Sequence, residues 1–266
     1  MLIIETKNYK ELSKRAAEIV IVEVLKKPNL VIGLPTGETP VGMYKLLVKT
    51  YKKKKMDFSK IKCFNLDEYY PIKRKDRNSF YYFMHKNLFN KINIKETNAH
   101  ILNGEAKNPE KECENYEEMI KKKPIDIQIL GLGVNGHIAF NEPGAEKTSK
   151  TRLVELSQET IKINKLPKIS ATGNFSLFKS ATASCGILNP DLKINKTKST
   201  KALTMGIATL MAAKKIILLA SGKNKAEAIK HLIEGKKDKN WPVSFLKGHK
   251  NLIVIIDEDA ARLLQG

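Results

Sequence analysis

Cysteine is scarce in this chain and does not fall at a metal-ligand spacing. The 266 residues contain three cysteines, Cys63, Cys113 and Cys185, which are odd in number and widely separated. A secreted disulfide framework has an even number of cysteines at short, regular spacings. No pair of His, Cys or carboxylate residues has a recognisable ligand spacing either. We therefore expect reduced thiols, a cytoplasmic location and no bound metal.

Several other signatures are missing. No apolar run reaches the roughly 18–20 residues that a membrane-spanning helix needs, and the first residues do not resemble a signal peptide. There is no G-x-S-x-G elbow for a nucleophilic serine, and neither a P-loop nor a dinucleotide fingerprint appears. The sequence thus argues against a membrane partner, a serine hydrolase and a nucleotide-binding loop.

Acidic residues are too few to balance the basic ones. Lys and Arg number 48 against 28 Asp and Glu, which gives a formal net charge of +20. A balance this basic raises nucleic acid as a partner. However, nearly all the positive charge is Lys, spread along the chain with no basic stripe interleaved with aromatics. We expect no nucleic acid partner and favour an anionic small molecule.

The apolar residues form short β-branched runs that alternate with helical patterns. The first twenty-five residues are predicted to be a capped helix, and later runs such as "NLVIGL", "IDIQILG" and "NLIVIID" are typical of buried strands. This alternation predicts an α/β fold of three layers: a doubly wound, largely parallel, Rossmann-like sheet with helices on both faces. We expect a single domain over residues 1–266, with an atypical insertion or lid at about 165–200.

Unusual residues follow four of the predicted strands. The segments are "GLPTGETP", "NLDEYY", "GLGVNGH" and "SGKNK". In parallel sheets, ligands bind at the carboxyl ends of the strands. We expect these four segments to meet at one edge of the sheet.

Two of these segments suit a phosphate. Glycines in a strand-to-helix turn let backbone N–H groups approach an anion, and the helix N-terminus favours negative charge. In the first, Thr36 and Thr39 add hydroxyl donors, and in the second Lys223 or Lys225 adds a cation. Glu38 counts against an anion unless its carboxylate points away. An ordinary capped turn and a solvated lysine are the alternatives.

The other two segments carry titratable groups. Asp67 and Glu68 are adjacent, so only one of them faces a cleft if they lie on a strand; a carboxyl in a water-poor cleft is a usable general base. A capping role for Asp67 is the alternative. His137 lies between Gly136 and Ile138 on the loop that carries Glu142, and a carboxylate can fix the tautomer of an imidazole. We expect structural roles for His85, His100, His231 and His249.

Eight segments together resemble the glucosamine-6-phosphate deaminase family, also called glucosamine/galactosamine-6-phosphate isomerases. They are "GLPTGETP", "FNLDEYY", "RNSFYYFMHKNLF", "ILNGEA", "ECENYEEMI", "GLGVNGHIAFNEPG", "KALTMGIATLM" and "SGKNKAEA". The resemblance covers nearly the whole chain except about 165–200. It implies hydrolytic deamination and isomerisation of glucosamine 6-phosphate to fructose 6-phosphate and ammonia, without a cofactor.

The resemblance also implies roles for single residues. Asp67 matches the general base, His137 the imidazole that assists ring opening, and Glu142 the carboxylate that orients it. Asn135 falls where many members have Asp and others Asn, so the pH profile is expected to differ. The residues that match the phosphate site are Thr36, Gly37, Glu38, Thr39 and Lys225.

The sequence departs from the family pattern at three places. Glu38 replaces a small residue of the phosphate loop. The family's phosphate-binding Arg is absent, and Lys165 or Lys168 would replace it without the bidentate fork of Arg. Arg152 matches an activator site but Val154 stands where that site has Lys, so we expect no allosteric activation by N-acetylglucosamine 6-phosphate. Either a monomer or a homo-oligomer fits the sequence.

Two other functions fit the same scaffold. One is a hydrolase similar to 6-phosphogluconolactonase, and the other is a sugar-phosphate-binding protein without turnover. The "NLDEYY" and "FNEPG" segments favour the deaminase over both.

Overall fold

The structure is a computed structural model that describes residues 1–157, 160–161 and 199–264. The chain divides into two compact units, Met1–Leu156 with Ser199–Gly266, and Ser157–Lys198. The fold described below is that of the first unit. Most of the predicted insertion at 165–200, with Lys165, Lys168 and Cys185, lies outside the described residues.

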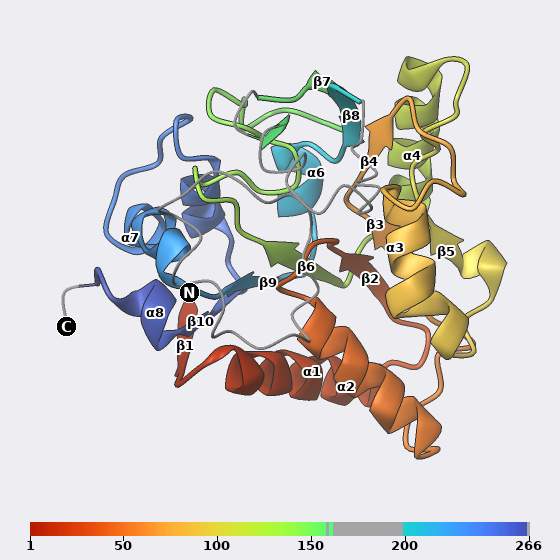
Figure 1. The fold of residues 1–266 in the computed structure, drawn as a ribbon, viewed down its shortest axis with the longest axis horizontal. Helices are drawn as coiled ribbons and strands as arrows, with labels where there is room; N and C mark the ends of the chain where they lie inside the picture. The colour runs from red at the N-terminus through yellow and green to blue at the C-terminus, as the bar shows by residue number, and fades with distance from the viewer. Residues whose placement is uncertain (158–159, 162–198, 265–266) are drawn as a thin grey trace, which may run out of the picture. The chain divides into compact units, whose positions relative to one another are not determined.

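Seven parallel strands form the central sheet of the first unit (Figure 1). Their order is β1-β10-β9-β6-β2-β3-β5, and every neighbouring pair runs parallel. The prediction of a largely parallel sheet is confirmed. The strands are β1 (Leu2–Thr6), β2 (Val31–Leu34), β3 (Lys62–Asn65), β5 (Ala99–His100), β6 (Ile127–Gly131), β9 (Lys215–Ala220) and β10 (Leu252–Asp257).

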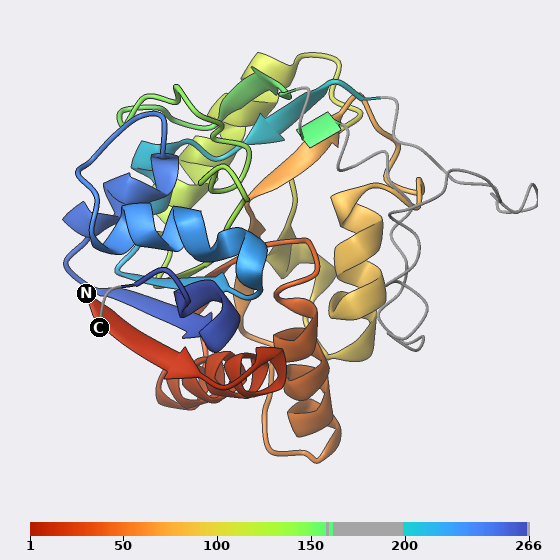
Figure 2. The ribbon, with the colours of Figure 1, turned by 60° about the vertical axis from the view of Figure 1, so that its left-hand side comes forward.

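Helices cover both faces of this sheet because its strands are apolar on both sides. In β9, Ile216 and Leu218 belong to one hydrophobic cluster, whereas Ile217 and Leu219 belong to the other. Successive strand residues face opposite ways, so this run needs cover on each face. Helices α1, α2 and α3 pack on one face, and α4, α6 and α7 on the other (Figures 1 and 2). The helices are α1 (Tyr9–Lys26), α2 (Val41–Lys52), α3 (Phe80–Asn87), α4 (Pro109–Lys122), α6 (Ile207–Met211), α7 (Ala226–Ile233) and α8 (Glu258–Ala261).

The start of the chain differs from the prediction. The predicted helix is present as α1, and the Asn8 side chain caps it by accepting from the N–H groups of Lys10 and Glu11. The residues before it, Leu2–Thr6, form strand β1 rather than helix, and they pair in parallel with β10. This pairing joins opposite ends of the chain, so no local pattern reports it.

A second sheet stands beside the first. It has three antiparallel strands in the order β4-β8-β7, with β4 at Asp67–Tyr70, β8 at Lys201–Thr204 and β7 at Arg152–Glu155. Asp67 therefore begins a strand of this small sheet, whereas the sequence placed it at the end of a strand. The chain leaves the main sheet at Asn65 and reaches β4 after the single residue Leu66.

The strand order reverses between β2 and β6. From β2 the chain continues to β3 and then β5 on one side, and from β6 it continues to β9 and β10 on the other. Such a reversal leaves a crevice at the carboxyl ends of the strands. Strands β9, β6, β2 and β3 are consecutive neighbours, so the four predicted segments do follow adjacent strand ends.

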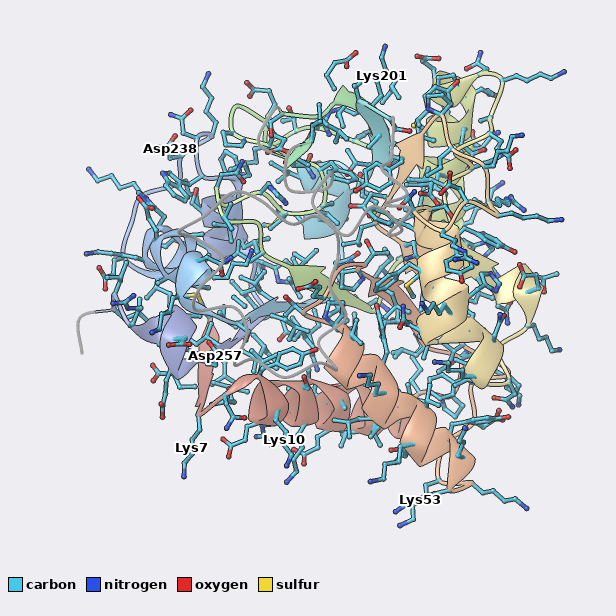
Figure 3. The ribbon with its side chains drawn as sticks, in the orientation of Figure 1. Lys7, Lys10, Lys53, Lys201, Asp238 and Asp257 are labelled. Carbon is cyan, nitrogen blue, oxygen red and sulfur yellow. The ribbon has the colours of Figure 1, made fainter. Side chains whose placement is uncertain are left out.

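Lysines dominate the exposed surface of the described residues. Lys7, Lys10 and Lys53 are exposed, and their side chains extend outward around α1 and α2 (Figure 3). Among the described helices, none has the length and apolar content to cross a membrane.

Asp126 ties together three elements at the amino-terminal edge of the sheet. Its Oδ2 accepts from the Val31 N–H at 2.9 Å and from Lys27 at 2.6 Å, and its Oδ1 accepts from Lys214 at 2.9 Å. Burial acts to raise the pKa of this carboxyl, but the bonds to Lys214, Lys27 and Val31 outweigh it and the pKa is lowered.

We predict that Asp126→Ala lowers the free energy of unfolding by about 1–3 kcal/mol, because the buried Val31 N–H loses its acceptor. The part of this loss that comes from the ionised carboxylate should be present above the ordinary carboxyl pKa and should disappear as the pH falls through the lowered value. Urea unfolding at neutral and acidic pH measures both effects. Asp126→Asn keeps one acceptor and should lose less; equal losses for the two variants would contradict this account.

Candidate functional site

The loop between β2 and α2 presents a row of backbone donors. None of the N–H groups of Thr36, Gly37, Glu38 and Thr39 donates to another described residue, and neither threonine hydroxyl has a described partner. Gly37 has φ +93°, and an added Cβ there would meet nothing within 4 Å. Positive φ favours glycine, and the loop leads directly into a helix N-terminus. The loop thus has the donors and the open space that a phosphate needs.

Two tyrosines hold this loop in place, the exposed Tyr9 and the buried Tyr44. The Tyr9 hydroxyl donates to the Glu38 carbonyl at 3.0 Å and accepts from the Gly42 N–H at 2.8 Å. The Tyr44 hydroxyl donates to the Pro35 carbonyl at 2.5 Å. Sequence reasoning missed Tyr9, because it lies about thirty residues from the loop and no local motif links the two.

The loop after β9 brings a lysine toward the same site. Asp257 accepts from the Ser221 hydroxyl and, at 3.0 Å, from the Gly222 N–H, which anchors the loop to the end of β10. Burial lowers the pKa of Lys225, and the Glu38 carboxylate partly offsets that effect. Lys225 and Glu38, from two loops separated by one strand, therefore lie near enough to interact.

Asp67 has the environment of a general base. Its side chain is buried, and its Oδ1 has no hydrogen-bond partner among the described residues. Burial raises the pKa of Asp67 well above its ordinary value, and the neighbouring Glu68 raises it further. A buried carboxyl oxygen without a partner is costly for folding, which is common where a side chain must face a ligand.

The adjacent Glu68 has the capping role. Its carboxylate accepts from the N–H groups of Phe80 and Tyr81, both at 2.8 Å, at the start of α3. The bonds that cap the next helix thus come from Glu68, whereas Asp67 Oδ1 accepts none from the described residues, so the two side chains differ in their contacts.

The loop after β6 orients an imidazole. His137 Nδ1 lies 2.8 Å from Asn135 Oδ1, and Asn135 Nδ2 donates to Glu142 Oε2 at 2.9 Å. His137 Nδ1 also lies 3.6 Å from Glu142 Oε2. Because an amide oxygen only accepts, this arrangement assigns a proton to Nδ1.

Gly133 makes room for this imidazole. Its N–H donates to the His137 carbonyl at 2.9 Å, which closes the turn. An added Cβ on Gly133 would lie 2.3 Å from ring atoms of His137. Any larger residue would displace the histidine, so the glycine is required by close approach.

The end of β8 joins the Asp67 segment to the histidine loop. The Met205 N–H donates to the Leu66 carbonyl at 2.8 Å, and the Met205 carbonyl accepts from Asn141 Nδ2, also at 2.8 Å. The Phe140 N–H donates to Thr204 Oγ1 at 3.0 Å. These bonds hold the two titratable segments in a fixed relation, and no local sequence pattern predicts them.

Comparisons with known proteins identify the family of this chain. A family model described as glucosamine-6-phosphate isomerases/6-phosphogluconolactonase matches residues 6–185 and 174–254. The chain belongs to this family. It is 48% identical over 265 residues to the glucosamine-6-phosphate deaminase of Clostridium novyi (strain NT), which covers 99% of this chain and 100% of that protein.

Two solved structures share the fold. A monomeric glucosamine-6-phosphate deaminase has a TM-score of 0.85 and 37% identity, covering 99% of this chain and 100% of that one. The 6-phosphogluconolactonase from Thermotoga maritima has a TM-score of 0.70 over 97% of this chain and 99% of that one. Its 18% identity extends the likeness to the fold alone.

In this family member, the other four histidines make packing or hydrogen-bond contacts, as expected. His100 stacks on Phe64, His231 stacks on Trp241, and His249 Nε2 lies 2.8 Å from the Ala213 carbonyl. His85 lies against Tyr81 and Phe89. Across the described residues, no group of three or more His, Cys, Asp or Glu side chains could hold a metal ion.

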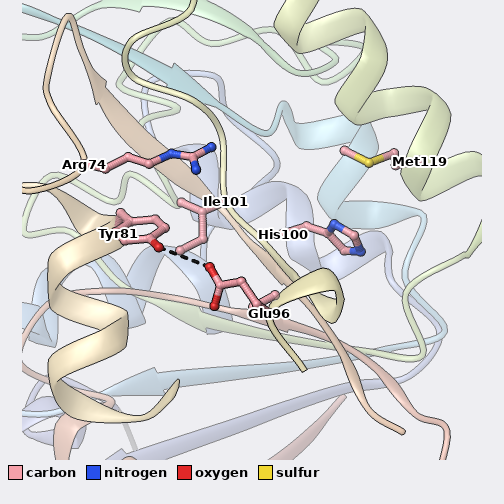
Figure 4. A pocket seen from close by; sticks show the side chains of 7 residues that line it. Arg74, Tyr81, Glu96, His100, Ile101 and Met119 are labelled. Atoms are coloured by element: carbon pink, nitrogen blue, oxygen red, sulfur yellow. Dashed lines mark hydrogen bonds between the residues drawn. The ribbon is translucent and has the colours of Figure 1, made fainter. Parts of the chain in front are cut away.

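A pocket of about 240 Å³ lies away from the four loops. It is lined by Arg74, Tyr81, Glu96, Ala99, His100, Ile101 and Met119 (Figure 4). None of the predicted site residues lines it, so the candidate site rests on the strand ends and not on this pocket.

We predict that Asp67→Asn makes the protein more stable at pH 8. A carboxyl whose folded pKa is raised favours folding only while protonated, and this contribution is lost as the pH rises toward the folded value. The midpoint of thermal unfolding should rise by about 2–4 °C or more at pH 8. The gain should shrink as the pH falls toward 4. A lower midpoint for the variant at pH 8 would contradict the burial of an unpartnered carboxyl.

Proposed function

We propose that this protein converts glucosamine 6-phosphate and water to fructose 6-phosphate and ammonia. The observation that carries the proposal is the juxtaposition at adjacent strand ends of the unpartnered Asp67 carboxyl, the oriented His137 imidazole and the open N–H row of the β2–α2 loop. The names of the relatives support the substrate, and the chain is similar to them over nearly its full length.

The first step is opening of the sugar ring. His137 Nε2 takes the proton of the C1 hydroxyl and returns a proton to the ring oxygen, so the C1–O5 bond breaks and an aldehyde forms. This requires an imidazole that is neutral at Nε2 and held in one orientation. Asn135 supplies the orientation at Nδ1, and Glu142 holds Asn135 in turn.

The second step moves a proton between two carbons. Asp67 takes the proton from C2 of the open chain and delivers it to C1. The C1 oxygen gains a proton as the amine nitrogen loses one, so the 2-amino aldehyde becomes a ketimine at C2 with a hydroxyl at C1. Water then adds at C2 and the C2–N bond breaks, releasing ammonia and leaving the ketone. Burial suits Asp67 to this task, because a raised pKa lets the carboxyl hold the transferred proton between the two carbons.

The phosphate is assigned to the β2–α2 loop with Lys225. The hydrogen-bond donors offered to the phosphate lie on one side of the site. They are the N–H groups of Thr36 to Thr39, the two threonine hydroxyls and the Lys225 ammonium. Glu38 is exposed, so its backbone N–H can serve while its carboxylate stays in solvent.

We predict that purified protein releases ammonia from glucosamine 6-phosphate. Asp67→Asn should abolish turnover because no other described carboxyl takes its place, and His137→Gln should reduce kcat by about 10²-fold or more. Coupled assays for ammonia and fructose 6-phosphate measure both. A parallel assay with 6-phosphogluconolactone tests the hydrolase alternative. Binding without turnover of either compound would favour a sugar-phosphate-binding protein and contradict the proposal.

We predict that Glu38→Ser lowers the KM for glucosamine 6-phosphate by up to about fivefold at pH 7.5. The carboxylate is exposed beside the phosphate loop, so its repulsion is screened and worth at most about 1 kcal/mol. Steady-state kinetics at low and high salt measure the change, which should shrink with salt. Glu18→Ser makes the same charge change on α1, where the half-exposed Glu18 pairs with Lys14 and Arg15, and should leave KM unchanged. An equal drop in both variants would assign the effect to net charge.

A further inference from the structure

Glu68 is buried deeply for a carboxylate that touches no cation among the described residues. It is 2% exposed, and its hydrogen bonds within that part of the chain come from backbone N–H groups. Oε1 accepts from Tyr69 at 2.9 Å and from Phe80 at 2.8 Å, while Oε2 accepts from Tyr81 at 2.8 Å. Burial of a carboxylate costs free energy, so we expect its hydrogen bonds to hold a part of the structure in place.

These bonds complete the start of α3. The first N–H groups of a helix have no intrahelical acceptor. Glu68 accepts from the first two, and the Ser79 hydroxyl accepts from the third, that of Tyr82, at 2.9 Å. Negative charge at a helix N-terminus is favourable. Strand β4 and helix α3 are thus joined by one side chain, although nine residues of loop separate them in the chain.

The start of α3 also contacts the histidine loop. The Phe80 ring lies 4.8 Å from that of Tyr69 and stacks at 5.8 Å on that of Phe140, between centroids. Phe140 lies between His137 and Glu142 in the chain. Fixing Phe80 therefore fixes a packing partner of both titratable segments.

We propose that Glu68 is a positioning residue: its carboxylate fastens the first turn of α3 to the strand that begins with Asp67, and so holds the Asp67 carboxyl and the histidine loop in their working relation. The inference rests on the proposed function and adds to it a residue that makes no contact with substrate. Glu68 acts through Asp67, its neighbour on the opposite face of the strand.

The charge of Glu68 gives this role a separate signature. The acidic groups near Glu68 are Asp67 on its own strand and Asp76 on the loop before α3. The phenol of Tyr69 is also close to Glu68. Leu203, which pairs with Glu68 from β8, carries no charge. Burial raises the pKa of Glu68 to about 7 despite its three backbone bonds. Once ionised, Glu68 raises the pKa of Asp67, so its removal should lower that pKa. Because the two carboxyls are adjacent, they titrate as a pair.

Glu68→Gln separates this role from simple stability. The amide keeps an acceptor for Tyr69 and Phe80 but loses the charge and the acceptor for Tyr81. We expect kcat to fall about tenfold with KM little changed, and the acid limb of kcat against pH to move to lower pH. Glu96→Gln is the matched control, because Glu96 accepts from the Tyr81 hydroxyl on the exposed side of the same helix turn (Figure 4). The control should keep the wild-type profile.

Glu68→Asp tests position without loss of charge. The shorter side chain cannot reach from β4 to both N–H groups of α3, so kcat should fall while the acid limb stays at its wild-type pH. Wild-type kcat in this variant would overturn the proposal. So would a Glu68→Gln enzyme whose acid limb stays at the wild-type pH and whose kcat falls only in proportion to the folded fraction measured by circular dichroism.

A measurement without turnover keeps the two proposals distinct. The ¹³C chemical shift of the Asp67 carboxyl, followed against pH, should titrate at lower pH in Glu68→Gln than in wild type and Glu96→Gln. If wild type does not turn over glucosamine 6-phosphate, the proposed function fails and this titration still tests Glu68. An identical Asp67 titration in all three proteins would overturn the inference.

Discussion

The hydrogen bonds at the end of β8 are the constraint on which the site depends. Asp67 and His137 are carried by different segments, and the main sheet alone would leave both at the tips of loops. Through Thr204 and Met205, backbone and amide bonds connect Leu66 on one side with Phe140 and Asn141 on the other. The small antiparallel sheet therefore holds the two strand-end loops in one fixed arrangement. Catalysis by pre-organised groups requires such an arrangement.

This arrangement concentrates costly groups where the core can support them. The strands behind the site are apolar on both faces, and residues such as Ile217 and Leu218 are fully buried. Against that background lie the Asp67 carboxyl, whose Oδ1 has no partner among the described residues, and Lys225, which is partly desolvated. Glu68, next to Asp67, is buried with no cation partner in the described part of the chain. Buried polar groups that are unfavourable for folding thus lie where the strand order reverses, and a well-packed apolar core surrounds them. This is the pattern expected of a functional site.

The sequence predicts the local parts of this structure and misses the parts that depend on distant pairing. Alternating strand and helix patterns and the segments "GLPTGETP" and "SGKNK" carry their own turn chemistry, so their places at adjacent strand ends could be foreseen. Strand β1 could not, because its partner β10 lies some 250 residues away in the chain and its own run is short. Tyr9 and Thr204 act on the site through bonds to Glu38 and Phe140 that cross 29 and 64 residues.

The histidine loop shows why residue identity must be read with geometry. From sequence, Glu142 is the natural partner of His137, yet the amide of Asn135 stands between them and makes the shorter contact with Nδ1, 2.8 Å against 3.6 Å. A neutral acceptor fixes the tautomer without placing a full charge against the ring, whereas Glu142 supplies charge from one step further away. Orientation of the imidazole thus depends on two side chains, because Asn135 contacts the ring and Glu142 holds Asn135. A carboxylate in place of Asn135 would put a full charge against Nδ1 and would remove the amide donor that now binds Glu142.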